Sequence, residues 1–331
     1  MHVLVTGGTG FLGGHLAERL VSRGDKVRAL VRSTSDTTLL RGLGVELAQG
    51  DITDPASLRE AARGIEIVYH AAALASDWGS YAQFHRVNAE GTGHVIDACR
   101  DQGVRRLVHV STQSVVFAFD DHLGTDESRP IPARHRDPYS ATKAEAEKMV
   151  LAAHGGDLFT TALRPHIIWG PRDTTVLPRI EALARRKQLV LVGGGQVRTS
   201  LSYVDNVIDA LLLCAERDAA GGEAFFAVDR EPVTISDFVS GLCEAVGAPP
   251  PSGSIPYGVA FSVATVLEWI WRLLRKQSPP PISRYGVAVM GRNTVFSREK
   301  ARRLLDYTPA VGFEEGMRRI REWKGRNPGQ A

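Results

Sequence analysis

The sequence has few cysteines and no strong excess of charge of either sign. Three cysteines, Cys99, Cys214 and Cys243, lie far apart with no C-x-x-C pair, and the formal net charge of the 331 residues is +3. The cysteines give neither a disulfide framework nor a zinc site, and they favour a reducing compartment. The charge is too small to indicate nucleic acid as the main partner. We expect no bound metal and no nucleic-acid partner.

Long hydrophobic runs are also scarce. Glycines interrupt the first apolar residues, so no signal peptide is predicted and we expect a cytoplasmic protein. The most apolar stretch is 255–276. Its helical core, about residues 257–274, is near the lower length limit for crossing a bilayer, but it contains Glu268 and Arg272, which argue against a spanning helix. Either this stretch covers an apolar pocket, or it lies on a membrane surface with Trp269 and Trp271 at the interface. Both interpretations imply a hydrophobic ligand.

Glycine, by contrast, is concentrated near the start of the chain, in the stretch TGGTGFLG. Val3 to Val5 predict a buried strand before it, and the spacing of apolar residues from Phe11 to Leu20 predicts a helix after it. Glycines here permit a tight turn, a close approach of a pyrophosphate and close helix packing, while the helix N–H groups face the phosphates. This pattern predicts a dinucleotide site that includes Gly7, Thr9, Gly10, Phe11, Leu12 and Gly13.

Further apolar strands alternate with helical patterns along the first half of the chain. The predicted strands are 27–31, 45–47, 65–70, 107–110 and 159–163. We therefore expect an α/β fold with a doubly wound parallel sheet of the Rossmann type and a smaller C-terminal substrate-binding domain. The cofactor-binding domain is expected at 1–170, completed by about 200–230, and the substrate-binding region at 171–199 and 231–331. Strand ends bring Asp51, Ile52, Ala71, Ala72 and Ala73 to the ligand edge of the sheet.

The end of the second predicted strand meets the adenine ribose in a dinucleotide fold. An acidic residue there would accept a hydrogen bond from the 2′-hydroxyl, but this chain has Arg32 and Ser33. A unit charge pair near 4 Å is worth about 4 kcal/mol at intermediate dielectric, which is enough to change the preference. NADP(H) is favoured, and NAD(H) remains an alternative because Arg32 can stack on adenine.

Evidence for chemistry comes from the stretch DPYSATKAE, in which Tyr139 and Lys143 are four residues apart on a predicted helix. They share one helix face, and an ammonium beside a phenol lowers the phenol pKa toward the working range. A hydroxyl after the strand 107–110, in the stretch STQS, is expected to share the substrate oxygen with Tyr139. These residues predict an oxidoreductase rather than a protein that only binds the cofactor.

The motifs TGGTGFLG, GDITD, HAAA, NAEGT, STQS, YSATK, RPHIIWGP and SYVDN follow one another along nearly the whole chain. In this order they resemble the extended short-chain dehydrogenases/reductases. The resemblance implies that Thr112, rather than Ser111, holds the substrate hydroxyl, that Tyr139 is the acid/base and that Lys143 is its partner. It also implies a homodimer through helices near 81–102 and 138–154. The further cofactor-site residues that it implies are Asn88, Pro165, Ile167 and Ile168.

Within that group, the stretches STQSVVF, RPHIIWGP and DWGSY resemble two enzyme types. Similarity to 3β-hydroxysteroid dehydrogenases and sterol-4α-carboxylate 3-dehydrogenases implies NAD(P)-dependent oxidation of a 3β-hydroxyl on a sterol-like substrate, followed by decarboxylation for a 4-carboxysterol. The alternative is an NADPH-dependent 2-alkyl-3-oxoalkanoate reductase. A nucleotide-sugar epimerase ranks third, because such enzymes usually carry an Asn that helps hold the nucleotide diphosphate in the segment where this chain has His166, Ile167, Ile168 and Trp169. A non-catalytic NADP-sensing protein ranks last, because Tyr139 and Lys143 are both kept. His70 and His166 are expected to be packed, hydrogen-bonded histidines.

Overall fold

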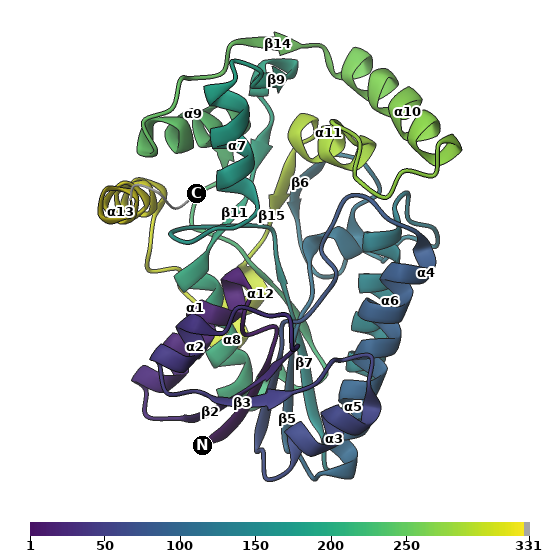
Figure 1. Ribbon diagram of the computed structural model, residues 1–331, viewed down its shortest axis with the longest axis vertical. Helices are drawn as coiled ribbons and strands as arrows, with labels where there is room; N and C mark the ends of the chain where they lie inside the picture. Colours follow the sequence, from purple (N-terminus) through teal and green to yellow (C-terminus); the bar gives the residue numbers. More distant parts are fainter. Residues whose placement is uncertain (328–331) are drawn as a thin grey trace.

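A seven-stranded parallel sheet forms the centre of the molecule in this computed structural model, which describes residues 1–327 (Figure 1). Its order is β12-β7-β5-β4-β1-β2-β3, so the chain changes direction of winding between β1 and β4. Ligands bind in open α/β sheets at the carboxyl ends of the strands where this change occurs. The strands are β1 (His2–Thr6), β2 (Lys26–Val31), β3 (Glu46–Gln49), β4 (Ile67–His70), β5 (Arg106–Val110), β7 (Phe159–Pro165) and β12 (Ala224–Ala227).

Helices cover both faces of this sheet, as the sequence pattern predicted (Figure 1). One face carries α1 (Phe11–Ser22), α2 (Thr38–Gly42), α8 (Val204–Glu216) and α12 (Glu299–Leu305). The other carries α3 (Pro55–Ala62), α5 (Gly91–Asp101) and α6 (Pro138–Ala152), with α4 (Tyr81–Phe84) and a π-helical turn, η1 (His85–Glu90), leading into α5. The predicted α/β fold is confirmed.

Smaller sheets build the second part of the molecule. One has the order β13-β10-β15-β6, and two pairs are β11 with β8 and β14 with β9. Their strands are β6 (His122–Thr125), β8 (Ile167–Trp169), β9 (Val190–Val192), β10 (Arg198–Thr199), β11 (Leu201–Tyr203), β13 (Val233–Thr234), β14 (Gly253–Ile255) and β15 (Thr294–Phe296). The helices are α7 (Val176–Arg185), α9 (Ile235–Ala245), α10 (Tyr257–Leu273), α11 (Arg284–Gly291) and α13 (Phe313–Arg326). Short 3₁₀ turns are η2 (Gln113–Val116), η3 (Gly193–Gly195) and η4 (Asp218–Ala220).

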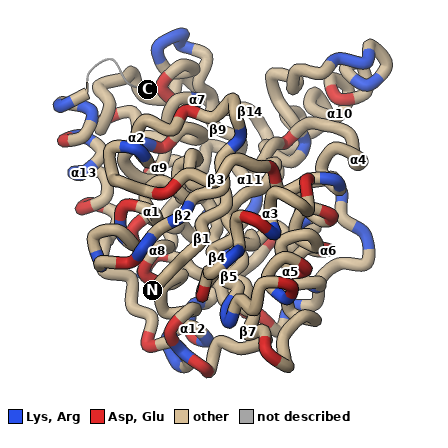
Figure 2. The backbone as a smooth tube through the Cα atoms, turned by 60° about the horizontal axis from the view of Figure 1, so that its bottom comes forward, with Lys and Arg blue, Asp and Glu red and all other residues tan. Residues whose placement is uncertain are grey.

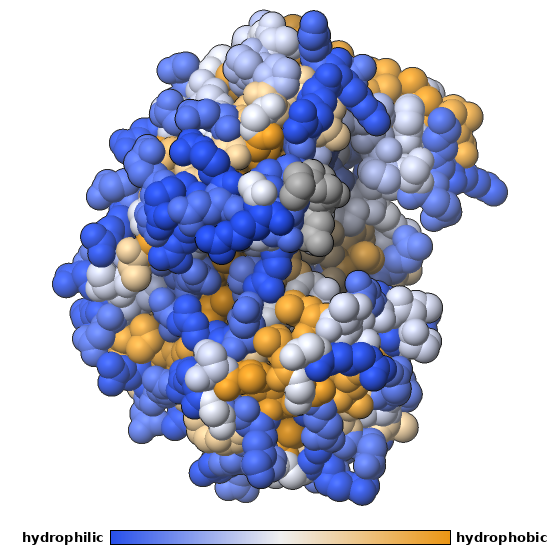
Figure 3. Space-filling view, turned by 60° about the vertical axis from the view of Figure 1, so that its left-hand side comes forward, coloured by the Kyte–Doolittle hydropathy of each residue, from blue (hydrophilic) through white to orange (hydrophobic). Residues whose placement is uncertain are grey.

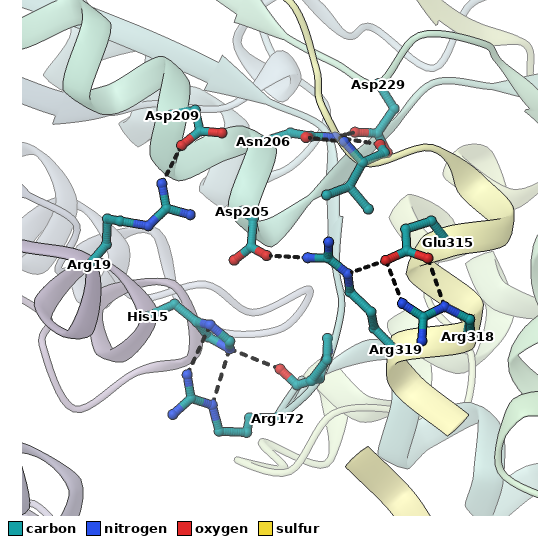
Figure 4. A network of polar contacts seen from close by, with 12 residues as sticks. His15, Arg19, Arg172, Asp205, Asn206, Asp209, Asp229, Glu315, Arg318 and Arg319 are labelled. Carbon is teal, nitrogen blue, oxygen red and sulfur yellow. Dashed lines mark hydrogen bonds and ion pairs between the residues drawn. The ribbon is translucent and has the colours of Figure 1, made fainter. Parts of the chain in front are cut away.

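The two parts interleave along the sequence. The segment that contains α8 and β12 returns to the central sheet, whereas β6 leaves it and pairs with β15. Polar contacts fasten α1 to α8 and to the loop after β8 (Figure 4). His15 Nε2 donates to the carbonyl oxygen of Pro171 at 2.9 Å, and Arg19 pairs with Asp209 of α8 at 2.5 Å. The edge of the central sheet that faces the second part is therefore held in place, and this edge carries the candidate site.

Lys and Arg residues are interspersed with Asp and Glu along the chain (Figure 2), in keeping with the small net charge. Within the described residues, all three cysteines are buried and unbridged. In the same part of the chain, no helix has both the length and the apolar character needed to cross a membrane.

Candidate active site

The glycine-rich turn after β1 is shaped by close backbone contacts. Gly7 has a φ of +76°, and a Cβ on it would lie 2.7 Å from the amide nitrogen of Ala72. A Cβ on Gly13 would lie 2.1 Å from the carbonyl oxygen of Gly7. The absence of a side chain at Gly13 therefore allows the start of α1 to pack directly against the turn. Gly10 caps α1, whose first turn holds no acidic residue. The turn therefore leaves helix N–H groups open to an anion, and this cradle fits the pyrophosphate of a dinucleotide.

A pocket of about 340 Å³ opens beside this turn, at the carboxyl ends of the first strands. The predicted residues that line it are Gly7, Thr9, Gly10, Arg32, Asp51, Ile52, Ala71, Ala72 and Ala73. Sequence reasoning missed Leu30, Ser35, Gly50, Leu74 and Val87, which also line it. Most of these residues are adjacent in sequence to predicted ones. The sequence therefore predicted the position of the pocket but not its full width.

Other predicted cofactor residues lie outside the lining of this pocket. Phe11, Leu12 and Gly13 form the first turn of α1, and Ser33 is exposed beside Arg32. Pro165 ends β7, and Ile167 and Ile168 lie on β8, partly buried against the main core. Their contact with a cofactor stays a prediction.

Arg32 and Asp51 both line the pocket, but their side chains differ in their hydrogen bonds. The carboxylate of Asp51 accepts hydrogen bonds from the backbone N–H and the hydroxyl of Thr53, both at 2.8 Å, and so closes its own turn. Arg32 is exposed, and within residues 1–327 its side chain forms no hydrogen bond or ion pair. A positive charge at the pocket wall is thus available to a ligand.

Tyr139 and Thr112 come together from different elements. Asp137 caps α6 by accepting from the backbone N–H of Ser140 at 2.8 Å, which places Tyr139 in the first turn of the helix. The side chain of Thr112, which follows β5, lies close enough to the Tyr139 phenol to affect its pKa, and the Thr112 hydroxyl donates to that of Ser114 at 3.2 Å. Burial raises the pKa of Tyr139 to about 12, although the Thr112 side chain lowers it. At neutral pH the phenol therefore carries its proton.

The neighbouring hydroxyl of Ser111 has a different partner. It donates to Glu147 of α6 at 2.6 Å, in a fully buried position. Glu147 also pairs with Arg164 of β7, with N–O distances of 2.6 and 2.9 Å. This buried cluster ties the end of β5 to α6 and leaves Thr112 as the hydroxyl beside Tyr139.

Lys143 is buried one helical turn after Tyr139, and its ammonium points to the end of β5. Its Nζ donates to the carbonyl oxygen of Val110 at 2.7 Å and lies 3.1 Å from Nε2 of His109. Burial lowers the pKa of Lys143 to about 7, against the opposite effect of Glu147. The sequence suggested that Lys143 lowers the pKa of Tyr139. That expectation is wrong in this structure, because burial outweighs any such effect and the Tyr139 pKa is raised.

Asn88 lies in η1 and holds the loop beside the pocket. Its Oδ1 accepts from the backbone N–H of Leu74 at 2.8 Å, and its Nδ2 donates to Thr142 of α6 at 3.2 Å. π-Helical turns are frequent at functional sites, and here one turns Asn88 inward between the loop and α6. Asn88 thus joins the pocket wall to the helix that carries Tyr139.

The two histidines near the site are packed and hydrogen-bonded, as predicted. His70 contacts the hydroxyls of Thr6 at 2.7 Å and Thr92 at 3.0 Å, and His166 contacts that of Thr294 at 3.0 Å. Within residues 1–327, no group of three or more His, Cys, Asp or Glu side chains could hold a metal ion.

Comparison with known proteins assigns this arrangement to a family. Residues 4–257 match the model of the 3-beta hydroxysteroid dehydrogenase/isomerase family. The chain belongs to this family. It is 40% identical over 328 residues to the 2-alkyl-3-oxoalkanoate reductase of Stenotrophomonas maltophilia, covering 97% of this chain and 98% of the relative. It is 33% identical over 325 residues to the mouse decarboxylating sterol-4-alpha-carboxylate 3-dehydrogenase, covering 95% and 88%.

Solved structures agree with the fold and the cofactor. MoeE5 in complex with UDP-glucose and NAD superposes with a TM-score of 0.77 at 26% identity, covering 99% of this chain and 100% of the other. A UDP-glucose 4-epimerase of Thermotoga maritima gives a TM-score of 0.80 at 23% identity, covering 99% and 100%, and this shows the fold alone. The predicted resemblance to the extended short-chain dehydrogenases/reductases is confirmed: the family member described here is an NAD(P)-dependent oxidoreductase that acts on CH–OH groups.

Aromatic side chains pack beside Tyr139. Tyr285 of α11 bonds to the hydroxyl of Ser114 at 2.6 Å, and its ring centroid lies 6.4 Å from that of Tyr139. Phe117, Phe119 and Phe261 join Tyr285 in one apolar cluster. Sequence reasoning assigned Tyr285 no role, because nothing in its local pattern indicates that α11 folds back over the site.

Above this cluster, α10 presents an apolar face to the outside. Ala260, Ala264 and Glu268 are its buried residues, and Glu268 accepts from the backbone and side chain of Arg284 at 2.7 and 2.8 Å. Orange atoms gather on this projecting part of the surface (Figure 3). The exposed apolar residues on the helix and just after it are Val259, Val263, Val266, Trp269, Leu273 and Leu274, each at least 45% exposed. Trp271, predicted at the same interface, is only half-exposed.

Proposed function

We propose that this protein is an NADPH-dependent reductase of a hydrophobic 2-alkyl-3-oxoalkanoate. One observation carries the direction of the reaction: the chain is 40% identical, over 97% of its length, to a protein named 2-alkyl-3-oxoalkanoate reductase. Tyr139 is buried and its pKa is raised, so the phenol is protonated at neutral pH. A protonated phenol can donate a proton to a developing alkoxide, which is what ketone reduction requires. The same relative supports this substrate class.

In the proposed reaction, the bound nicotinamide cofactor supplies a hydride to the ketone carbon. Tyr139 donates its phenolic proton to the ketone oxygen as the C–O double bond becomes a C–O single bond. The Thr112 hydroxyl holds the same oxygen, and its place beside Tyr139 supports this shared role. Lys143, fixed at the end of β5, binds the nicotinamide ribose and stabilises the phenolate that remains.

The preference for NADPH rests on Arg32. Its guanidinium lines the cofactor pocket with Ser35, and its side chain has no polar partner among the described residues. An unpaired cation at the end of β2 attracts a 2′-phosphate, and an acidic residue at that position would repel it.

The hydrophobic character of the substrate rests on the cluster of Phe117, Phe119, Phe261 and Tyr285 next to Tyr139. Such a wall binds an alkyl chain or a ring system better than a sugar. For this reason, and because the match to the epimerase shows the fold alone, a nucleotide-sugar epimerase ranks below the reductase. A non-catalytic NADP-sensing protein ranks lower still, since it needs neither Tyr139 nor Thr112.

The second candidate is oxidation of a 3β-hydroxyl on a sterol-like substrate, favoured by 33% identity to the mouse sterol-4-alpha-carboxylate 3-dehydrogenase. Here Tyr139, as phenolate, takes the hydroxyl proton while hydride leaves the same carbon for the oxidised cofactor. If a carboxylate lies beside the new ketone, its C–C bond breaks, carbon dioxide leaves and the electron pair forms an enolate. Both candidates use the same residues and a hydrophobic substrate.

The exposed face of α10 leads us to include peripheral membrane contact in the proposal. Arg272, Arg275 and Lys276 follow its apolar residues and can approach anionic headgroups while Trp269 and Leu273 enter the interface. A substrate dissolved in the bilayer would then reach the aromatic cluster under α10. We also propose a cytoplasmic protein that forms a homodimer through α4, α5 and α6, which sedimentation equilibrium would test.

A nicotinamide absorbance assay with purified protein tests the proposed function. A 2-alkyl-3-oxoalkanoate is offered with NADPH and with NADH, and a 4-carboxysterol and a 3β-hydroxysteroid are offered with NADP⁺ and with NAD⁺. The proposal expects the fastest turnover with the oxoalkanoate and NADPH. Turnover of the sterols alone would establish the second candidate, and no turnover in any combination would refute both.

A further inference from the structure

His109 is a buried histidine that the proposed reaction leaves without a role. It lies on β5, and the parallel register places it between His70 of β4 and Ala162 of β7. The side chain is 0% exposed, and the ring centroids of His70 and His109 are 5.1 Å apart. Its Nε2 lies 3.1 Å from Nζ of Lys143.

The direction of this hydrogen bond follows from the charges. Burial, Lys143 and His70 all lower the pKa of His109 well below its usual value, so the ring is neutral. When Lys143 is charged, its ammonium can only donate hydrogen bonds, so Nε2 of His109 accepts and the ring proton is on Nδ1. This Nδ1 has no partner within residues 1–327. An unpaired buried N–H lowers the stability of the fold. A histidine at this position is therefore unfavourable for stability alone, which points to a role for its contact with Lys143.

We propose that His109 is a positioning residue, which holds the ammonium of Lys143 at the end of β5 as a neutral hydrogen-bond acceptor. Together with the Val110 carbonyl it takes two of the three N–H donors of Nζ, which leaves one for the cofactor ribose. The inference rests on the proposed function in one respect: that Lys143 takes part in the reaction. It assigns to β5 the placement of both Lys143 and Thr112.

The charge of Lys143 depends on a small set of neighbours. From α6 it faces Glu147, whose charge is shared with Arg164 of β7, and from β5 it faces His109, with the neutral His70 of β4 behind. An acceptor for the ammonium favours the charged form. We therefore expect removal of that acceptor to lower the pKa of Lys143 further. Since the ammonium is the active form, activity in the reductive direction falls as pH rises through the pKa of Lys143. In a variant that lacks the His109 acceptor, this fall should occur at lower pH.

The test compares His109→Phe, which removes the acceptor, with His109→Gln, which keeps one. Thr160→Val is the matched control, because it deletes a different buried hydrogen bond, from the Thr160 hydroxyl to the Val150 carbonyl at 2.5 Å. The first readout is NMR titration of ¹³Cε-labelled lysine in the cofactor-free protein, with Lys143 assigned from a Lys143→Arg sample. The second is the pH profile of kcat/KM.

We expect His109→Phe to lower the pKa of Lys143 by about one unit and to shift the alkaline limb of kcat/KM by the same amount. In His109→Gln, the pKa of Lys143 and the alkaline limb of kcat/KM should both lie close to their wild-type values. Thr160→Val should shift neither the pKa nor the limb. An unchanged pKa in folded His109→Phe, or an equal shift in Thr160→Val, would overturn the inference. His109→Leu replaces His109→Phe if the latter does not fold. If the wild type reduces no substrate, the proposed function fails, while the NMR titration still decides the role of His109.

Discussion

Thr112, which follows β5, lies beside Tyr139 of α6, and its side chain lowers the pKa of the phenol against the effect of burial. The strand end supplies one hydroxyl and the first turn of the helix supplies the other. Neither element could shift relative to the other without breaking the bond between Ser111 and Glu147. In the proposed reaction, the reacting oxygen of the substrate therefore meets two hydroxyls held by elements that are already bonded to each other.

Tyr139→Phe removes the transferable proton and keeps the ring. We expect kcat to fall by about 10²-fold or more, because general acid catalysis at this oxygen is lost. Steady-state kinetics with NADPH would measure the effect. Tyr81→Phe, which alters an exposed tyrosine on α4, is the control and should leave kcat unchanged. Retention of more than half of the wild-type kcat in Tyr139→Phe would remove Tyr139 from the mechanism.

Arg32→Glu should reverse the preference between the two nicotinamide cofactors. The substitution replaces an unpaired cation at the pocket wall with an anion, so the 2′-phosphate is repelled and the ribose hydroxyl gains an acceptor. We expect the ratio of kcat/KM for NADPH to that for NADH to fall at least about tenfold. Arg41→Glu on α2 makes the same change of charge outside the pocket and should alter the ratio little. Equal ratios in both variants would show that Arg32 does not contact the phosphate.

Lys143→Met should stabilise the protein at neutral pH while abolishing activity. The pKa of Lys143 is lowered to about 7 in the folded state, so between about pH 7 and 10.5 the unfolded chain binds more protons than the folded one, and this group makes stability rise with pH. Below pH 7 the full cost of burying the charge is present. After allowing for the Val110 carbonyl and Nε2 of His109, which both lose their donor, we expect a gain of about 1–2 kcal/mol at pH 7 that shrinks toward pH 10. Urea unfolding at several pH values measures it, and a loss of stability at pH 7 would contradict this account.

Glu147→Ala should destabilise the fold strongly. It leaves Arg164 buried without its counter-ion and Ser111 without its acceptor. Breaking a buried pair in this way costs about 3–5 kcal/mol. The exposed pair of Glu46 and Arg28 gives the comparison, because Glu46→Ala should cost less than about 1 kcal/mol. Urea denaturation of both variants decides, and similar costs would show that the cluster does not fasten β5 to α6.

Replacing Trp269 and Leu273 by serine should weaken binding to vesicles that contain anionic lipid. Both side chains are 66% exposed on α10, so the change removes apolar surface without opening the core. We expect the bound fraction in a sedimentation assay to fall at least about fivefold. Leu123→Ser, which alters a leucine 78% exposed on β6, is the matched control. An equal bound fraction for the wild type, the double variant and the control would exclude α10 as the contact surface.

The sequence predicted the parts of the site that depend on local pattern. The glycine turn, the strand ends at Asp51 and Ala71, and the Tyr139–Lys143 spacing all lie where the residues indicated. The direction of the Lys143 side chain and the raised pKa of Tyr139 could not be predicted, because both depend on how deeply α6 is buried against β5. Tyr285 and His109 were missed for the same reason: their contacts join segments that only the tertiary fold brings together.

Transfer of deuteride from NADPH labelled at C4 tests the central claim most directly. The protein is incubated with the labelled cofactor and a 2-alkyl-3-oxoalkanoate, and the product is examined by mass spectrometry. The account predicts a 3-hydroxy acid with one deuterium at C3, formed by the wild type and not by Tyr139→Phe. Folded wild-type protein that binds NADPH and forms no deuterated alcohol would contradict it.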